Sequence, residues 1–403
     1  MEPHYKHVAR RSAGRDLIGI QDTTEYNYEH HKGIIKEGEL GTISDNASIG
    51  LRVHPMLIMD AEDHFPYGFS SMQIVNRAGK TLDRHERKYQ KLPIEEKESY
   101  RWLKAIEETK QRLAQAKTLT IIADRESDIY QLWSRTLDEK THLVIRTSLL
   151  RKFIDEQENE IQSSSSLISL GSHTIYIPGR LGKQDKGRQA GLEISFQKGY
   201  TLKPKKLKEQ KSNSDPDRIE LNMLSVKEIL PEGADIKEPV SWLLLTDLPI
   251  KDLKDALHII HLYKSRWNIE QVFRLTKQKG FNIEESQLET ARGLENLISL
   301  VFIAVIRIYQ MVKSRDNQQR EVGDIFEENQ QQVLEKINPS LEGRTERSKN
   351  RNRPKTLAYY IWVIARLGNW KPEDRDPPGP MTFKRGWESL QAYLKIAQLS
   401  SSP

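Results

Sequence analysis

Three acidic residues in this sequence are placed so that they could bind metal ions. Asp22 follows the short apolar run LIGI, and Asp124 follows a second one, LTIIA. Both runs have the length and β-branched content of buried strands, so each carboxylate is expected at the C-terminal end of a strand. If the two strands lie side by side, the carboxylates meet at one edge of the sheet. Hard divalent cations prefer such oxygen ligands, and two-metal phosphodiester cleavage needs several of them together.

Taken singly, each aspartate has a simpler explanation, because aspartate commonly caps a turn or a helix start after a strand. A helical segment from Lys251 to about Lys279 favours the metal-binding interpretation. Within it, Arg266, Glu270 and Lys277 lie 3, 7 and 14 residues after Tyr263. At roughly 100° per residue these four side chains fall within an arc of about 60° if the helix is continuous.

This stripe predicts a phosphate-handling surface. Glu270 would complete a carboxylate cage, and the neighbouring cations and the Tyr263 hydroxyl would hold phosphate groups. The alternative is an ordinary salt-bridged helix face, which is common in a chain with 30% charged residues. Trp267 and Phe273 indicate partly buried surroundings, which favours the functional interpretation.

The segments around these residues predict an α/β layer. The runs at 51–60 and 67–77 are expected strands of the same sheet, and the charged stretch 94–117 is expected to be helical. Residues 242–246, WLLLT, predict another buried strand. The longest apolar run, 297–306, is too short to span a bilayer and predicts a buried helix within 292–313.

Changes in composition divide the chain into four parts. The serine-rich and basic stretches between residues 147 and 241, with short strand patterns, predict a β-rich insertion. The expected parts are a first core segment with Asp22 and Asp124 (1–146), the insertion (147–241), a second core segment with the Glu270 helix (242–316) and a helical C-terminal region (317–403).

Composition limits the possible chemistry. The chain has 403 residues, more than one compact domain usually contains, and a net charge of +6 with a pI near 9.1. This basic balance makes nucleic acid a plausible partner. The absence of cysteine excludes disulfides, zinc-thiolate sites and a cysteine nucleophile; it fits a reducing cytoplasm and equally fits chance loss.

Three motifs carry a resemblance to a known family. QDTTEY at 21–26, ADRESDIY at 123–130 and the Y-x2-R-x3-E-x6-K pattern from Tyr263 to Lys277 resemble the DDE transposases of the IS-four family, above all the Tn-five-like members. The likeness runs from Leu17 to about Met311 and includes EKESYRWL at 96–103. It implies an RNase H-like core interrupted by a β-rich insertion, with a helical C-terminal region. It also implies Asp22, Asp124 and Glu270 as catalytic metal ligands for Mg²⁺ or Mn²⁺.

The same resemblance implies residues that bind DNA. Tyr263, Arg266 and Lys277 would hold the backbone of the transposon end, Trp242 would stack a flipped base, and Arg146 would approach the DNA. Trp242 equally fits a plain core tryptophan, and an arginine at a strand end is often just exposed. Two basic stretches, KPKKLK at 203–208 and RTERSKNRNRPK at 344–355, are either phosphate contacts or solvated loops.

Glu126 and Asp128 are expected to orient Arg125 or the metal ligands. As a whole, the likeness implies cut-and-paste transposition, with transposon ends and target DNA as partners. It also implies a homodimer when two ends are synapsed, no membrane, and a nucleoid-associated place in the cytoplasm.

The sequence departs from the family at its start, because 21 residues precede Asp22 where Tn-five-like members carry a DNA-binding domain. One alternative is therefore an N-terminally truncated inhibitor or fragment of a transposase that binds DNA or dimerises. Another is an RNase H-like nuclease without strand transfer, which would leave the Tyr-Arg-Glu-Lys stripe unexplained.

Overall fold

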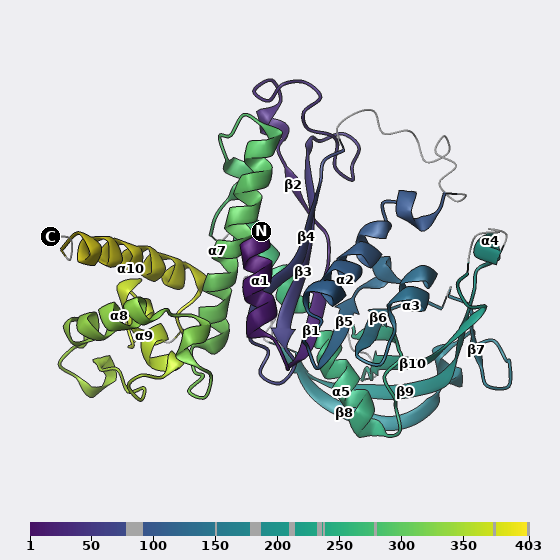
Figure 1. Ribbon diagram of the computed structural model, residues 1–403. Coiled ribbons are helices and arrows are strands. Elements are labelled where there is room, and N and C mark those ends of the chain that lie inside the picture. The colour runs from purple at the N-terminus through teal and green to yellow at the C-terminus, as the bar shows by residue number, and fades with distance from the viewer. Residues whose placement is uncertain are drawn as a thin grey trace.

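A computed structural model describes residues 1–77, 92–149, 151–177, 187–208, 214–231, 236, 238–277, 280–373 and 376–400. The described residues form a mixed eleven-stranded sheet with helices on both faces (Figure 1). Its hydrogen-bonded order is β2-β3-β1-β5-β6-β11-β10-β9-β7, with β4 paired to β3 and β8 to β9. The strands are β1 (Asp16–Gln21), β2 (Thr24–Asn27), β3 (Gly50–Asp60), β4 (Pro66–Val75), β5 (Thr118–Ala123), β6 (Thr141–Arg146), β7 (Phe153–Asp155), β8 (Ile168–Ile177), β9 (Arg188–Leu202), β10 (Arg218–Glu228) and β11 (Ser241–Thr246).

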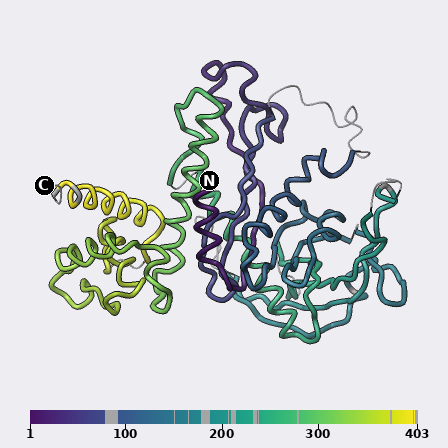
Figure 2. Tube along the Cα trace, in the orientation of Figure 1, coloured from purple at the N-terminus to yellow at the C-terminus, as the bar shows by residue number. Residues whose placement is uncertain are grey.

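The helices differ in what they cover. α2 and α3 pack on one face of the sheet, α5, α6 and α7 lie on the other, and α8, α9 and α10 gather beyond α7 (Figures 1 and 2). This arrangement gives the mixed α/β fold that the sequence predicts. The helices are α1 (Glu2–Arg11), α2 (Tyr100–Arg112), α3 (Tyr130–Thr136), α4 (Lys205–Lys208), α5 (Leu253–Lys264), α6 (Trp267–Lys277), α7 (Ala291–Ser314), α8 (Glu328–Leu341), α9 (Leu357–Leu367) and α10 (Pro380–Ser400).

The centre of the sheet is parallel and buried on both faces. β1, β5 and β6 run in the same direction, with Ile20 opposite Ile122 and Ile122 opposite Val144. Successive side chains of a strand point to opposite faces, so Leu17 joins the core under α2 while Ile18 joins the core under α5 to α7. Parallel strands buried in this way need continuous apolar runs, which explains LIGI and LTIIA.

Three sequence predictions are refined by the structure. The expected helix at 94–117 is a short 3-10 turn, Ile94–Glu96, followed by α2. The strands expected at 147–241 do form, and β7 to β10 extend the same sheet through the β10–β11 pair. The helical segment at 251–279 is divided into α5 and α6, and its residues 278 and 279 lie outside the described part of the chain.

Helix α7 confirms the buried-helix prediction for the apolar run at 297–306. Its 24 residues are long and apolar enough to cross a membrane by length and composition alone. In the fold, however, it packs against β4, α6, α9 and α10 and contributes Phe302, which is fully buried, to the core. A mostly buried helix of this kind is common in the core of proteins that do not enter membranes.

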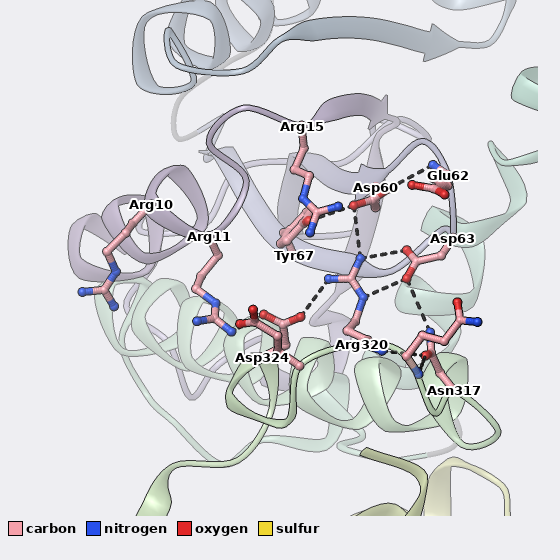
Figure 3. A pocket seen from close by; sticks show the side chains of 12 residues that line it. Arg10, Arg11, Arg15, Asp60, Glu62, Asp63, Tyr67, Asn317, Arg320 and Asp324 are labelled. Carbon is pink, nitrogen blue, oxygen red and sulfur yellow. Dashed lines mark hydrogen bonds and ion pairs between the residues drawn. The ribbon is translucent and has the colours of Figure 1, made fainter. Parts of the chain in front are cut away.

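The C-terminal helices are joined to the sheet at the end of β3 that lies far from Asp22. There Arg320 binds Asp60, Asp63 and Asp324, and its guanidinium lies 4.0 Å from the Phe65 ring centre (Figure 3). A pocket of about 490 Å³ surrounds this cluster. Since Asp60 pairs with Leu17 at the start of β1, the pocket and the strand-end carboxylates occupy opposite ends of the sheet.

Candidate active site

Asp22 and Asp124 lie next to each other at one edge of the sheet. β1 and β5 are parallel and hydrogen-bonded, and each aspartate is the first residue beyond its strand. The backbone N–H of Thr23 donates to Asp22 Oδ1 at 2.8 Å. The N–H of Glu126 donates to Asp124 Oδ1 at 3.0 Å, so Asp124 does cap the 3-10 turn that follows it. The capping role and the strand-end placement therefore coexist in this residue.

A break between two helices brings a third carboxylate to the same edge. α5 ends at Lys264 and α6 begins at Trp267, so the helical stripe is not continuous. Arg266, in the break, donates through Nη1 to Asp22 Oδ2 at 3.2 Å and through Nη2 to Glu270 Oε1. One guanidinium therefore joins a strand-end aspartate to an acid on α6, although Asp22 and Arg266 are 244 residues apart.

The charge balance at this edge is unfavourable to ionised carboxylates. Burial raises the pKa of Asp22 to about 6, and the nearby charges of Asp124 and Glu270 add to the rise. The Thr23 N–H and Arg266 oppose it but do not cancel it. Asp22 is therefore protonated more readily than an ordinary carboxyl, and a cation beside it would favour its ionised form.

The donor set suits a hard divalent ion. All three acids offer carboxylate oxygens, which Mg²⁺ and Mn²⁺ prefer, and Asp22 is a carboxyl whose pKa is raised by burial and, to a smaller extent, by nearby acids. Within the described residues, no three acidic or histidine side chains are close enough together to hold one ion. Arg266 instead supplies the positive charge between Asp22 and Glu270. Coordination by all three acids therefore requires this guanidinium to move.

Most of the residues expected to bind DNA gather beside these acids. The Trp242 ring on β11 lies 5.3 Å from the Tyr263 ring, edge to face. Arg146, opposite Leu244 in the β6–β11 pair, donates through Nη2 to Ser241 O at 3.2 Å. Its buried Nε has no hydrogen-bond partner among the described atoms. Burial raises the pKa of Tyr263, whereas the charges of Arg266 and Arg146 lower it, which places both cations near the phenol.

Lys277 lies apart from Trp242, Tyr263 and Arg146. It is the last residue of α6, and its Nζ lies 5.3 Å from the ring centre of Tyr26. Tyr26 is fully buried and its hydroxyl hydrogen-bonds to Thr276 Oγ1 at 2.6 Å. Lys277 thus lies further along α6 than Glu270, and its contact with the DNA backbone stays a prediction.

Sequence reasoning gave no role to Arg101, which links the two aspartate loops. From α2, Arg101 Nε donates to Thr23 Oγ1 at 3.1 Å and Nη2 donates to Glu126 Oε2 at 3.0 Å. Thr23 follows Asp22, and the Glu126 N–H binds Asp124. Arg101 belongs to the EKESYRWL motif, which predicts a helix but does not show that this cation faces the sheet edge.

A buried histidine completes the support behind Asp22. His54 on β3 lies 2.9 Å from Thr23 Oγ1 through Nδ1 and 3.2 Å from Gln21 Oε1 through Nε2. Burial lowers the pKa of His54 well below its ordinary value, so the ring is neutral. A neutral ring that donates from Nε2 to Gln21 accepts at Nδ1 from the Thr23 hydroxyl, and it fixes the residues on both sides of Asp22.

The two acids after Asp124 have partners other than Arg125. Glu126 pairs with Arg101, as above. Asp128 accepts from Arg151 Nε at 2.7 Å and from Thr147 Oγ1 at 2.6 Å, and it also binds Trp133 Nε1. Asp128 therefore ties the loop after β5 to the loop after β6, and its contribution to the site is to hold the backbone.

One comparison with known families matches this chain. A family model described as a transposase DDE domain matches residues 96–307, which is just over half of the chain. The matched range contains Asp124, Arg266 and Glu270 and begins after Asp22.

Proposed function

The chain belongs to the transposase DDE domain family, and we propose that it is a cut-and-paste DNA transposase of the IS-four, Tn-five-like type. Domains of this family generally use divalent metal ions, and transposases bind DNA. The match does not favour the inhibitor or fragment alternative. The proposal further assigns the sheet around β1, β5 and β6 to an RNase H-like core, with 147–241 as its β-rich insertion, and it places the protein on the nucleoid.

The observation that carries this proposal is that Arg266 binds both Asp22 and Glu270 at the sheet edge where Asp22 and Asp124 follow two neighbouring parallel strands. The Arg266–Asp22 contact joins residues that are 244 positions apart. A divalent ion bound there, Mg²⁺ or Mn²⁺, would supply Lewis-acid polarisation of the scissile phosphate and of the attacking oxygen. Asp22, Asp124 and Glu270 would hold the ion rather than transfer protons.

The chain's own groups position the DNA in this scheme. Arg266 would leave the carboxylates for a phosphate oxygen of the transposon end, since a guanidinium binds phosphate as readily as carboxylate. The Tyr263 hydroxyl and Arg146 would hold the next phosphates, and Lys277 one further along α6. Trp242, already edge to face with Tyr263, would stack a base displaced from the helix.

The reaction steps are those that the resemblance to the family implies. The oxygen of water attacks phosphorus at the transposon end, and the bond from phosphorus to the leaving 3′ oxygen breaks. The 3′-hydroxyl set free attacks a phosphorus of the opposite strand and displaces the 3′ oxygen of the flanking DNA, which closes a hairpin. A second water opens the hairpin and frees the same 3′-hydroxyl, which then attacks a phosphorus of target DNA and displaces a target 3′ oxygen. Two copies of the chain would act together when two ends are synapsed.

The test is cleavage of DNA carrying the element's own terminal sequence. Purified protein with Mg²⁺ and a pre-nicked duplex should yield hairpin and strand-transfer products, and Asp124→Ala should lose at least about 10³-fold in rate while still binding DNA. Asp316→Ala, which removes an acid that is 91% exposed, should cleave at the normal rate. Retained cleavage by Asp124→Ala would refute the metal-ligand assignment.

A further inference from the structure

The loop between α8 and α9 carries a row of cations that the proposed chemistry does not use. Residues 344–355 contain six lysines and arginines and one acid, Glu346, and each of the six cations is exposed. We call the five at odd positions the cationic ridge: Arg347, Lys349, Arg351, Arg353 and Lys355. Glu346 pairs with Lys349 at 2.6 Å. Within the described residues, the other four have no carboxylate at ion-pair distance.

The loop that carries the ridge has a fixed conformation, because residues between its cations form hydrogen bonds to the helices beneath. Asn350 Nδ2 donates to Tyr359 O at 3.1 Å and to Asn338 Oδ1 at 3.2 Å, and its N–H donates to Glu342 Oε1. Asn352 Nδ2 donates to Ala358 O at 3.3 Å. These bonds attach the loop to α8 and to the first turn of α9.

The inward asparagines determine where the cations point. Lys349 has extended backbone angles, φ −92° and ψ 153°, and in extended chain successive side chains face opposite ways. With Asn350 and Asn352 turned toward α9, Lys349, Arg351 and Arg353 face outward together. Ser348, two residues before Asn350, is also buried and points inward. Ser348 and Thr345 cap each other's backbone N–H groups. The alternation therefore holds the positive charges of Lys349, Arg351 and Arg353 in one row, in which only Lys349 has an acidic partner, Glu346.

We propose that the cationic ridge binds the sugar-phosphate backbone of duplex DNA away from the bond that is cleaved. Closely spaced cations that outnumber the one acid of the loop, Glu346, suit a polyanion with regularly spaced charges, and guanidinium forks suit phosphate oxygens. Because the loop is already fixed, little conformational entropy is lost when it binds. The loop 344–355 has no aromatic side chain for stacking, so the contact is to the backbone and independent of base sequence.

The position of the ridge excludes contact with the scissile phosphate from the same subunit. The C-terminal helices join the sheet through Arg320 and Asp60, at the opposite end of β1 and β3 from Asp22. Figure 1 shows them beyond α7, on the side away from the sheet. The ridge therefore meets flanking DNA or a second DNA segment. This choice of partner rests on the proposed function, whereas the charge row itself does not.

The test is binding to a long labelled duplex of arbitrary sequence, measured by fluorescence anisotropy in chelator over a series of salt concentrations. The variant Arg347→Gln/Arg353→Gln/Lys355→Gln removes three ridge cations whose side chains make no hydrogen bond among the described residues. The matched control Lys6→Gln/Lys140→Gln/Lys254→Gln removes three exposed lysines elsewhere. Each lost phosphate contact should lower the slope of log affinity against log salt by about 0.9, so the ridge variant should lose roughly 2–3 and the control much less.

Equal slopes for the wild type and the ridge variant, or equal losses in the ridge and control variants, would overturn the proposal. So would a ridge variant that binds duplex DNA normally but loses binding to single-stranded RNA or to vesicles rich in anionic lipid. Cleavage of the nicked terminal duplex with Mg²⁺ is measured in parallel. A wild type that does not cleave but shows ridge-dependent binding contradicts the proposed function alone. Normal cleavage with unchanged slopes contradicts the ridge alone.

Discussion

Two arginines at opposite ends of the same strands each bind more than one carboxylate, and they differ in how well the charges are balanced. Arg320 binds Asp60, Asp63 and Asp324 at 2.8 to 3.1 Å, and its side chain is 6% exposed. Arg266 binds Asp22 and Glu270, and its side chain is 14% exposed. By their ion pairs alone, the two clusters resemble each other.

The pKa shifts separate the two clusters. Although burial opposes it, hydrogen bonding to Arg320 holds the pKa of Asp63 below its ordinary value. Burial raises the pKa of Asp22 to about 6 despite Arg266. Arg320 therefore stabilises the ionised form of Asp63, whereas burial outweighs Arg266 at Asp22, whose ionised form a further cation would stabilise. The two clusters thus differ in the direction of the pKa shift at one carboxyl each.

The largest expected effect is the loss of Arg320. Arg320→Met leaves Asp60 buried without its cation and removes one of the two arginines that bind Asp324, and we expect a loss of about 3–5 kcal/mol in the free energy of unfolding, measured with urea. Arg266→Met should cost less, because Glu270 is 36% exposed. Added Mg²⁺ should recover the loss in Arg266→Met and not in Arg320→Met. Equal losses, both insensitive to Mg²⁺, would remove the distinction.

A second prediction concerns Arg101, which supports the loops that carry Asp22 and Asp124. Arg101→Ala releases Thr23 and Glu126, the neighbours of the two strand-end aspartates, and should slow DNA cleavage about 10–100-fold, or roughly 1.4–2.7 kcal/mol in the barrier. DNA affinity should stay near normal, and Arg101→Lys should recover part of the rate, since lysine keeps the charge but not the two-pronged geometry. Lys104→Ala, with a side chain 48% exposed on the same helix, is the control. Loss of DNA binding in proportion to rate would argue against positioning.

The third prediction compares how the stabilities of Asp22→Asn and Asp63→Asn, each relative to the wild type, depend on pH. The two dependences should have opposite signs. A carboxyl whose folded-state pKa is raised favours folding when protonated, so stability falls as the pH rises from about 4 through about 6. Asp22→Asn should therefore stabilise the protein in chelator at pH 7 by about 1–3 kcal/mol, and the gain should vanish below about pH 4.

Asp63→Asn should behave in the reverse way. Its folded-state pKa is lowered, so the ionised form stabilises the fold above its ordinary value of 3.8, and this contribution is lost as the pH falls further. The variant should be less stable than the wild type at pH 7 and approach it in strong acid. Thermal unfolding from pH 3 to pH 8 measures both variants. Curves of the same sign for Asp22→Asn and Asp63→Asn would contradict the proposed difference between the clusters.

Local sequence patterns predicted part of the candidate site. The runs before Asp22 and Asp124 have the composition of strands buried on both faces, so their ends could be located. The i, i+4 spacing of Arg266 and Glu270 predicted that they share a face, and their side chains are hydrogen-bonded. The arc calculated for the stripe required a continuous helix, and the structure instead has two helices: the break before Trp267 places Tyr263 on α5 and Glu270 on α6.

The sequence by itself determined which segments become buried strands and helices and where their carboxylates fall along the chain. It also determined that a positive charge recurs at every second residue from Arg347 to Lys355. These properties depend on residues a few positions apart. Only the tertiary structure decided that Arg266 binds Asp22, that Arg101 joins the two aspartate loops, and that Arg320 binds Asp60 at the end of β3. The contacts of Arg101 with Thr23, of Arg266 with Asp22 and of Arg320 with Asp60 join residues 78, 244 and 260 positions apart. Their geometry follows from sheet order and helix packing, to which no local periodicity is sensitive.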